Sequence, residues 1–194
     1  MTAMPIDDAK AALRAELRAR RAEAKRADPD AAVHAAQAFA RAGLGRFAVA
    51  AIYHPQGAEM DPYPLAAMLE RQGARIALPV AVERDAPLVF RLLSEGGQMR
   101  PDAVGIPSPT GDAADVRPDL VVCPLLGFDR RGGRLGQGGG FYDRTLAALR
   151  AGGPVVAIGL AYAAQELADI PLGPFDQPLD GVLTEQGYRP TERD

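Results

Sequence analysis

The chain has 194 residues, 47% of them hydrophobic and 24% charged, which is enough apolar material to bury one core. A formal net charge of −3 at pH 7 excludes a strongly basic nucleic-acid coat and a polyacidic tail. A lone cysteine, Cys123, excludes an internal disulfide and a cysteine-based zinc cluster, and its apolar neighbours predict a small buried side chain on a strand. Neither a signal-peptide pattern nor an apolar run of roughly 18 residues is present. We therefore expect a cytoplasmic protein that uses neither nucleic acid nor membrane.

The N-terminal segment, residues 1–46, differs in charge from the rest of the chain. It carries nine basic and six acidic side chains, against 13 and 19 in the remainder. Residues 8–27 lack Pro and Gly and are rich in Ala, Leu, Arg and Glu, which predicts a helix. Cations recur along one face of this helix at Lys10, Arg14, Arg18, Arg21 and Lys25. The stripe alone admits two interpretations: a surface for a triphosphate, or a solvated face with a Glu16–Arg20 pair.

A second helix is expected to start at Asp28-Pro29 and to end at Gly43. From residue 47 onward, short apolar runs alternate with helical segments. Strands are expected at 47–53, 75–79, 88–93, 120–126, 155–160 and 180–184, and helices from Asp61-Pro62 to about Gly73 and over 141–150. The polar stretch 94–118 is expected to be one long connection. This alternation predicts an α/β fold with a mainly parallel sheet, in one domain over residues 1–194.

A glycine-rich stretch follows the strand expected at 120–126 and leads directly into the helix expected at 141–150. It contains seven of the 21 glycines: Gly127, Gly132, Gly133, Gly136, Gly138, Gly139 and Gly140. Free N–H groups at a helix N-terminus, the helix dipole and the missing Cβ atoms together favour an anion. A flexible surface loop is the alternative. Ligands of α/β proteins bind at the carboxyl ends of strands, which favours the anion site.

This stretch does not match a standard nucleotide-binding fingerprint. No Lys is near enough to complete a Walker loop, and Phe141 occupies the place of the third Rossmann glycine. Arg134 can supply the positive charge through a forked contact with phosphate. Asp143 can hold Mg²⁺ between phosphates, or it can be an ordinary acidic residue in the first turn of a helix.

The run RLGQGGGFYDR, from Arg134 to Arg144, closely resembles the signature of the 5-formyltetrahydrofolate cyclo-ligase (5,10-methenyltetrahydrofolate synthetase) family. Four further segments resemble family motifs in the same order: residues 10–14, 53–59, 78–79 and 179–185. The resemblance implies a three-layer fold with helices on both faces of the sheet, related to the ribose-5-phosphate isomerase and CoA-transferase group. It also implies that the basic segment 1–46 packs on that domain.

The resemblance implies a ligase of one-carbon metabolism that uses ATP and Mg²⁺ to convert 5-formyltetrahydrofolate to 5,10-methenyltetrahydrofolate. ADP and phosphate are the expected by-products, and a phosphorylated formyl group (an iminium phosphate) is the expected intermediate. Arg134 and Arg14 are the expected catalytic residues. The implied ATP contacts are Lys10, Ala11, Ala12, Leu13, Arg14, Arg134, Leu135, Gly136, Gln137, Gly138, Gly139, Gly140, Phe141 and Tyr142.

The implied folate contacts are His54, Glu59, Gln137, Gly138, Gly139, Gly140 and Phe141. Asp143 and Asp180 are the implied Mg²⁺ ligands, whereas Arg21 and Lys25 are expected to stay on the surface. Two positions depart from the family pattern, since Gln137 stands where many relatives have an aromatic or basic residue and Ser108 where Glu is usual.

Two other functions remain open. One is a phosphotransferase acting on another small acyl substrate. The other is a non-catalytic paralogue that binds folate or a nucleotide, against which the presence of Arg134, Asp143 and Asp180 argues. The expected partners are small molecules, and a monomer is favoured.

Overall fold

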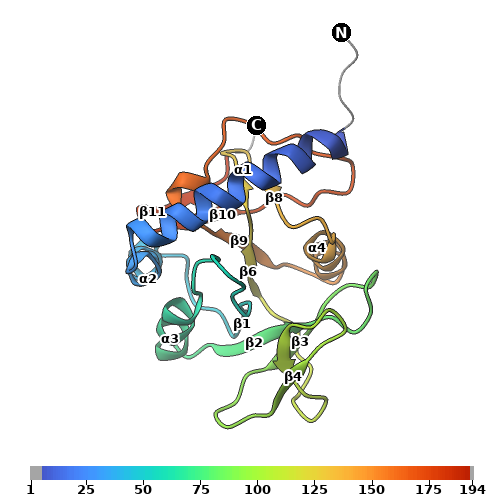
Figure 1. Cartoon of the computed structure of the whole chain (residues 1–194). Coiled ribbons are helices and arrows are strands. Elements are labelled where there is room, and N and C mark those ends of the chain that lie inside the picture. Colours follow the sequence, from blue (N-terminus) through green and yellow to red (C-terminus); the bar gives the residue numbers. More distant parts are fainter. Residues whose placement is uncertain (1–5, 193–194) are drawn as a thin grey trace.

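The computed structural model describes residues 6–192 and is built on a seven-stranded sheet with the order β11-β10-β9-β6-β1-β2-β3 (Figure 1). The inner strands, all parallel to one another, are β10 (Gly181–Thr184), β9 (Val156–Leu160), β6 (Leu120–Pro124), β1 (Val49–Ala51) and β2 (Arg75–Val80). Antiparallel strands form the two edges: β3 (Val89–Leu92) and β11 (Gly187–Pro190). The predicted mainly parallel sheet is confirmed.

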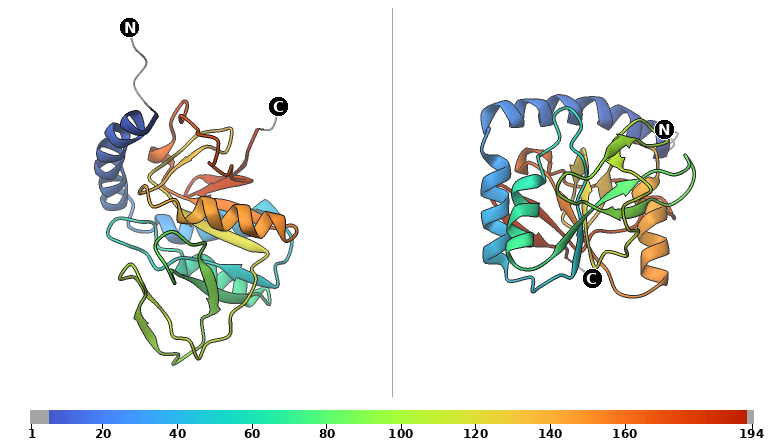
Figure 2. Two further views of the ribbon diagram at one scale, coloured as in Figure 1. Left: turned by 90° about the vertical axis from the view of Figure 1, so that its right-hand side faces the viewer. Right: turned by 90° about the horizontal axis from the view of Figure 1, so that it is seen from below.

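Helices cover both faces of the sheet. On one face lie α2 (Ala31–Ala42) and α3 (Tyr63–Arg71), and on the other lies α4 (Phe141–Ala151) (Figure 2). Successive residues of β6 pack in opposite directions: Val122 joins the core under α2 and α3, whereas Val121 and Cys123 join the core under α4. Cys123 is free and fully buried in β6, which confirms the predicted packed side chain, and this burial raises the pKa of its thiol to about 11.

The first helix, α1 (Ile6–Ala27), crosses the molecule at the end of the sheet where β6 and β9 finish (Figures 1 and 2). Leu17 anchors it, because this fully buried side chain packs with Leu126, Leu135 and Ile170 in the segments that follow those strands. The short turn η1 (Ala163–Gln165) also contacts α1. Among residues 6–192, no helix combines the length and apolar character needed to cross a membrane.

Element boundaries shift where local hydrogen bonds compete with regular structure. The helix expected to start at Asp28-Pro29 begins at Ala31, because Asp28 Oδ1 accepts the Asp30 amide at 3.1 Å and holds a turn before the helix. Gly43 ends that helix with φ 66°, as predicted. The strand expected at 47–53 is limited to Val49–Ala51.

Two stretches that were expected to be loops contain short hairpins. β4 (Met99–Pro101) pairs with β5 (Pro107–Pro109), and β7 (Gly127–Phe128) pairs with β8 (Arg134–Leu135). The prediction of one uninterrupted connection over 94–118 is therefore wrong. Strands this short leave no alternating pattern to recognise in the sequence.

The β7–β8 hairpin also divides the glycine-rich stretch. Asp129 Oδ1 accepts the Gly133 amide at 2.9 Å in the turn between the two strands. As a result, only residues 136–140 form the loop that leads into α4.

Candidate active site

A cavity of about 590 Å³ lies at the carboxyl ends of β1 and β6, beside α1. This volume is typical of small-molecule sites, and the carboxyl edge of a parallel sheet is where such sites occur. Polar side chains from five segments line it: Lys10, Arg14, Arg21, His54, Gln56, Glu59, Asp102, Arg134, Gln137, Asp143 and Asp176. Apolar lining comes from β2 and the residue after it, the segment before β3, the β4–β5 turn, the end of β6, β8 and the start of α4: Pro79, Ala81, Leu88, Val104, Ile106, Pro124, Leu125, Leu135 and Phe141.

The loop 136–140 closes one end of the cavity. Gly138 has φ 103° and Gly140 has φ 65°, conformations that L side chains rarely adopt. A Cβ atom on Gly138 would also lie 3.4 Å from Cζ of Arg14. Because this loop and the first residues of α4 line the cavity, the positive end of the α4 dipole faces it.

Three cations predicted from the sequence to contact ATP lie at the end of the cavity that the loop 136–140 closes: Lys10, Arg14 and Arg134. Arg14 Nε donates to the Gly136 carbonyl at 3.0 Å. Arg134 Nη2 donates to Asp143 Oδ1 at 2.6 Å, and Lys10 Nζ lies 2.5 Å from Asp176 Oδ2. Arg14 and Gly136, 122 positions apart in the sequence, thus meet in one wall of the cavity, beside two pairs of cation and carboxylate.

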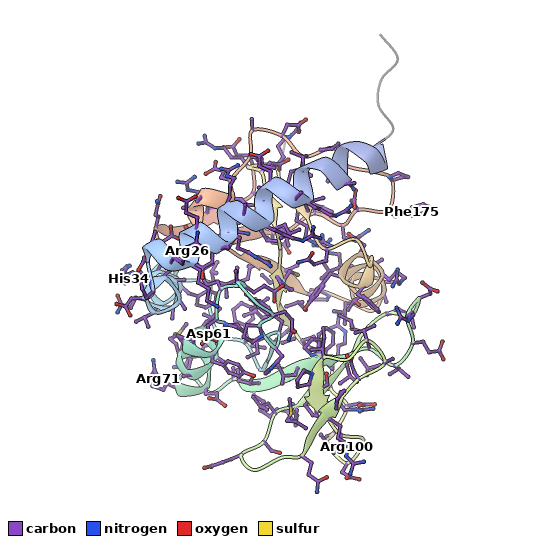
Figure 3. The ribbon with its side chains drawn as sticks, in the orientation of Figure 1. Arg26, His34, Asp61, Arg71, Arg100 and Phe175 are labelled. Carbon is purple, nitrogen blue, oxygen red and sulfur yellow. The ribbon has the colours of Figure 1, made fainter. Side chains whose placement is uncertain are left out.

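A segment without any recognised motif, residues 173–178, lies against the same side chains. The Gln177 carbonyl accepts from Arg134, and the Gln177 amide donates to Asp143 Oδ1 at 2.9 Å. Burial raises the pKa of Asp176. The hydrogen bonds that Asp176 accepts from Lys10 and from the Gly173 amide act in the other direction, and the pKa is lowered overall. Phe175, 84% exposed, does not line the cavity and lies at the outer edge of the molecule (Figure 3).

The opposite end of the cavity is built around a buried carboxylate. Glu59, 7% exposed, lies in the turn after β1, where its Oε2 accepts the Gln56 amide at 2.8 Å. Burial raises the pKa of Glu59, although the Gln56 amide and Arg21 act in the other direction. Beside it, the Tyr53 hydroxyl donates to the Met60 carbonyl at 2.6 Å, and burial raises the pKa of this tyrosine well above its ordinary value.

Arg21 corrects the sequence prediction, which placed it on the surface. It is 6% exposed, and its Nη1 lies 3.5 Å from Glu59 Oε1 and 3.3 Å from the Leu125 carbonyl oxygen. The physical reason is that Leu17 anchors α1 against the core. Arg21 lies one helical turn after Leu17 on the same face of the helix, so it is directed toward the cavity. Lys25 is exposed, as predicted, and donates to the Gly57 carbonyl at 2.8 Å.

Two further residues implied by the resemblance also line the cavity. His54 Nδ1 lies 3.1 Å from the Tyr63 hydroxyl oxygen, and Gln137 Oε1 accepts from Arg18 Nη2 at 2.8 Å. Arg18 therefore extends the cation stripe to the edge of the loop 136–140.

Some expected ATP contacts are not brought to the cavity. Ala11 is exposed and Leu13 packs near Leu17, while the side chain of Ala12 lies outside the described residues. Ser108, in β5, is also away from this cavity, because its Oγ donates to the Pro79 carbonyl at 3.1 Å and ties the hairpin to β2.

The two expected Mg²⁺ ligands lie in different places. Asp143 lines the cavity, whereas Asp180 Oδ2 accepts the Ala157 amide at 2.8 Å and lies 3.4 Å from Arg150 Nη2, outside the lining. Within residues 6–192, no group of three or more His, Cys, Asp or Glu side chains is placed to hold a metal ion. Protein ligands alone therefore do not form a complete metal site in this part of the chain.

Cations from α1 and β8 beside a glycine loop, with a buried carboxylate in the same cavity, indicate an α/β protein that binds small polar molecules. The sequence pattern of the 5-formyltetrahydrofolate cyclo-ligase family matches residues 6–185. The chain belongs to this family, and the resemblance noted in its motifs is confirmed.

Curated relatives carry the same name. The chain is 36% identical over 131 residues to the 5-formyltetrahydrofolate cyclo-ligase of Escherichia coli K12, covering 65% of this chain and 71% of that protein. It is 33% identical over 139 residues to the Haemophilus influenzae cyclo-ligase (69% and 73%) and 36% identical over 144 residues to that of Mycolicibacterium smegmatis (68% and 71%).

Solved structures support the fold. The Aquifex aeolicus 5,10-methenyltetrahydrofolate synthetase has a TM-score of 0.71 at 24% identity, covering 95% of this chain and 94% of that one. The Mycoplasma pneumoniae synthetase has a TM-score of 0.68 at 23% identity, covering 91% and 98%. The predicted three-layer α/β architecture is confirmed.

Proposed function

We propose that this protein converts 5-formyltetrahydrofolate to 5,10-methenyltetrahydrofolate in a Mg²⁺-dependent reaction that consumes ATP and releases ADP and phosphate. One observation supports this above all. The family's glycine motif, three cations and the buried Glu59 surround a single cavity in a chain that belongs to the cyclo-ligase family.

The chemistry explains the need for ATP. The formyl carbon on nitrogen 5 is amide-like, and its oxygen cannot leave as hydroxide. In the proposed first step, the formyl oxygen bonds to the γ-phosphorus of ATP as the bond to ADP breaks, which leaves an iminium phosphate. Nitrogen 10 then attacks the formyl carbon and gives up its proton, and the carbon–oxygen bond breaks to release phosphate. Such a reaction needs in-line positioning and charge stabilisation more than a protein nucleophile.

The glycine-rich end suits the triphosphate. The N-terminal turn of α4 and the loop 136–140 present backbone N–H groups at the positive end of the helix dipole. Arg14 and Arg134 supply forked guanidinium donors for phosphate oxygens, and Lys10 adds a third charge. To bind phosphate, Arg134 would replace its contacts with Asp143 and Gln177 by contacts with phosphate oxygens, and Lys10 would replace its contact with Asp176 in the same way. These residues stabilise the charge that develops on the transferred group.

The residues present fit Mg²⁺ in one respect. Mg²⁺ typically keeps several waters and uses one or two carboxylates together with substrate phosphates. Asp143 fits that pattern, because it lies in the cavity beside the phosphate-binding residues. Asp180 would reach this cavity only if it left the Ala157 amide and Arg150. When bound, Mg²⁺ would neutralise charge on the phosphate oxygens.

The opposite end suits the folate. A charged Glu59 can accept two N–H groups from the pteridine in a forked contact, and His54 lines the same cavity. Gln137 and the loop 136–140 line the same cavity from the glycine-rich end, so the formyl oxygen would meet the γ-phosphate beside this loop. Apolar residues around the β4–β5 hairpin offer a surface for the aromatic part of the substrate.

The test follows the appearance of the methenyl product by absorbance, with ADP measured in the same samples. We expect product only when 5-formyltetrahydrofolate, ATP and Mg²⁺ are all present, with about one ADP formed per product. Product formation at an equal rate without ATP would contradict the proposal. So would ATP hydrolysis that is independent of the folate, as expected of another phosphotransferase, or no turnover at all, as expected of a binding paralogue.

A further inference from the structure

Arg21 is buried beside a cavity without a complete set of partners. Its Nη1 reaches the Glu59 carboxylate at 3.5 Å and the Leu125 carbonyl at 3.3 Å. Its Nε is buried and has no hydrogen-bond partner among the described residues. Burying a guanidinium is costly unless its charge serves a neighbouring group. An arginine that serves only to stabilise the fold normally has all its buried donors hydrogen-bonded. Arg21 differs, because its contact with Glu59 is long and its Nε has no partner among the described residues.

We propose that Arg21 is a positioning residue for substrate recognition, which holds the Glu59 carboxylate charged and turned toward the cavity. This inference rests on the proposed function, in which Glu59 accepts the N–H groups of the pteridine. Arg21 is not part of the glycine motif, and the spacing of the cations on α1 does not set it apart from the other four.

No other buried group described around Glu59 carries a positive charge that could keep its carboxylate charged. Tyr53, just after β1, and Tyr142, in α4, interact electrostatically with Glu59, but burial raises the pKa of both, so both stay uncharged near neutral pH. Lys25, on α1, is exposed and directs its Nζ to the Gly57 carbonyl. The hydrogen bond from the Gln56 amide also lowers the pKa of Glu59, as does the charge of Lys25, but both remain when Arg21 is replaced. Among the described residues around Glu59, Arg21 is thus the buried cation.

Loss of Arg21 has a definite chemical consequence. Burial already raises the pKa of Glu59, and without the guanidinium this effect is less opposed, so the carboxyl takes up a proton at a higher pH. A protonated Glu59 presents an O–H donor to the N–H donors of the pteridine, which weakens binding. Raising the pH removes that proton and restores the acceptor. A merely structural role predicts no such recovery.

The experiment measures binding of 5-formyltetrahydrofolate and of ATP by calorimetry, together with KM and kcat, at intervals from about pH 6 to pH 9. The neutral variants are Arg21→Met and Arg21→Gln, and the latter keeps a donor for the Leu125 carbonyl. Arg20→Met is the matched control, because Arg20 lies on the same helix and pairs only loosely with Glu16 at 3.9 Å.

For Arg21→Met we expect the Kd of the folate to rise by about 10- to 100-fold near pH 6.5 and by far less at pH 9, because the effect follows protonation of Glu59. The Kd of ATP should change by less than about twofold, since ATP is proposed to bind at the other end of the cavity. Arg20→Met should match the wild type throughout. Arg21→Lys retains a charge, so its pH profile should run parallel to that of the wild type.

A folate defect of equal size at every pH would overturn the proposal, as would an equal defect in ATP binding or the same defect in Arg20→Met. If neither neutral variant folds, Arg21→Lys decides: a profile displaced to higher pH overturns the role of charge, and a parallel one supports it. Wild-type protein that binds no folate overturns the proposed function together with this inference. Wild-type protein that binds folate, with unchanged Arg21 variants, overturns this inference alone.

Discussion

The two ends of the cavity each pair an arginine with a carboxylate, but in different surroundings. At the glycine-rich end, Arg134 and Asp143 are 2.6 Å apart, and the Asp143 side chain is 26% exposed. At the other end, Arg21 and Glu59 are 3.5 Å apart, with both side chains at 8% exposure or less. The first pair is short but reaches water, so its members can exchange partners for a ligand. The second is longer and its carboxylate is more deeply buried, and this burial raises the pKa of Glu59.

The comparison teaches that the same ion-pair chemistry can serve two tasks. Where several backbone amides and cations converge, any one contact is replaceable by phosphate. Where one buried cation stands beside one carboxylate, a single substitution changes the protonation state of the site. We therefore expect substitutions at the two ends to separate the two substrates.

The largest effect should come from Glu59→Gln, which replaces one acceptor of Glu59 by a donor in a buried place. We expect folate binding to weaken by about 2–3 kcal/mol, with ATP affinity nearly unchanged. Titration of each ligand separately by calorimetry measures both. A matching loss of ATP affinity would end the distinction between the two ends, and unchanged folate affinity would remove Glu59 from the site.

Arg134→Ala and Arg14→Ala should each reduce the catalytic efficiency for ATP by about 10- to 150-fold, equivalent to about 1.5–3 kcal/mol for a lost charge-assisted hydrogen bond. Folate binding in the absence of ATP should stay close to that of the wild type. Arg130→Ala is the control, because Arg130 pairs with Glu166 on the exposed surface. Equal losses in all three variants would mean that net charge, not phosphate contact, explains the effect.

Gly138→Ala tests the conformation of the loop 136–140 at the glycine-rich end. The alanine must adopt φ near 103° and place its Cβ about 3.4 Å from the Arg14 guanidinium. We expect a cost of about 1–2 kcal/mol, divided between the unfolding free energy and ATP binding. Gly136→Ala is the control, since a Cβ there meets nothing within 4 Å. Indistinguishable melting curves and ATP affinities for the two variants would show that the loop adopts another conformation.

The smallest effect concerns the Lys10–Asp176 pair. Since the pKa of Asp176 is lowered from its ordinary 3.8, the unfolded chain binds more protons than the folded one around that pH. The stability that the pair contributes is therefore present above about pH 4 and is lost as the pH falls further. We expect Asp176→Asn to lower the unfolding free energy by about 0.5–1 kcal/mol near pH 7 and by almost nothing near pH 2.5. Denaturant unfolding at several pH values tests this, and a difference that grows in acid would contradict it.

Much of the architecture and one end of the site could be predicted from the sequence. Short apolar runs alternating with helical segments are strong local signals, and β2, β6, β9 and α4 appear close to their expected positions. The glycine stretch with Arg134 and Asp143 could also be found, since its residues are neighbours along the chain. Their chemistry is a property of the segment itself.

Tertiary structure decided the rest, because the deciding contacts join segments distant in the chain. Asp176 and Gln177 belong to no motif, yet the fold sets them against Lys10, Arg134 and Asp143. Asp180 matched a motif, yet its carboxylate turns to the Ala157 amide, away from the cavity.

The stripe on α1 shows the division most clearly. Helical periodicity by itself determined that Lys10, Arg14, Arg18, Arg21 and Lys25 share one face. It did not determine what that face contacts, since spacing carries no information on packing partners. The burial of Leu17 fixes the helix against the core and places Arg14 by the glycine loop, Arg21 by Glu59 and Lys25 in solvent. Burial is a property of the assembled fold, so only the tertiary structure could assign three different surroundings to three similar side chains.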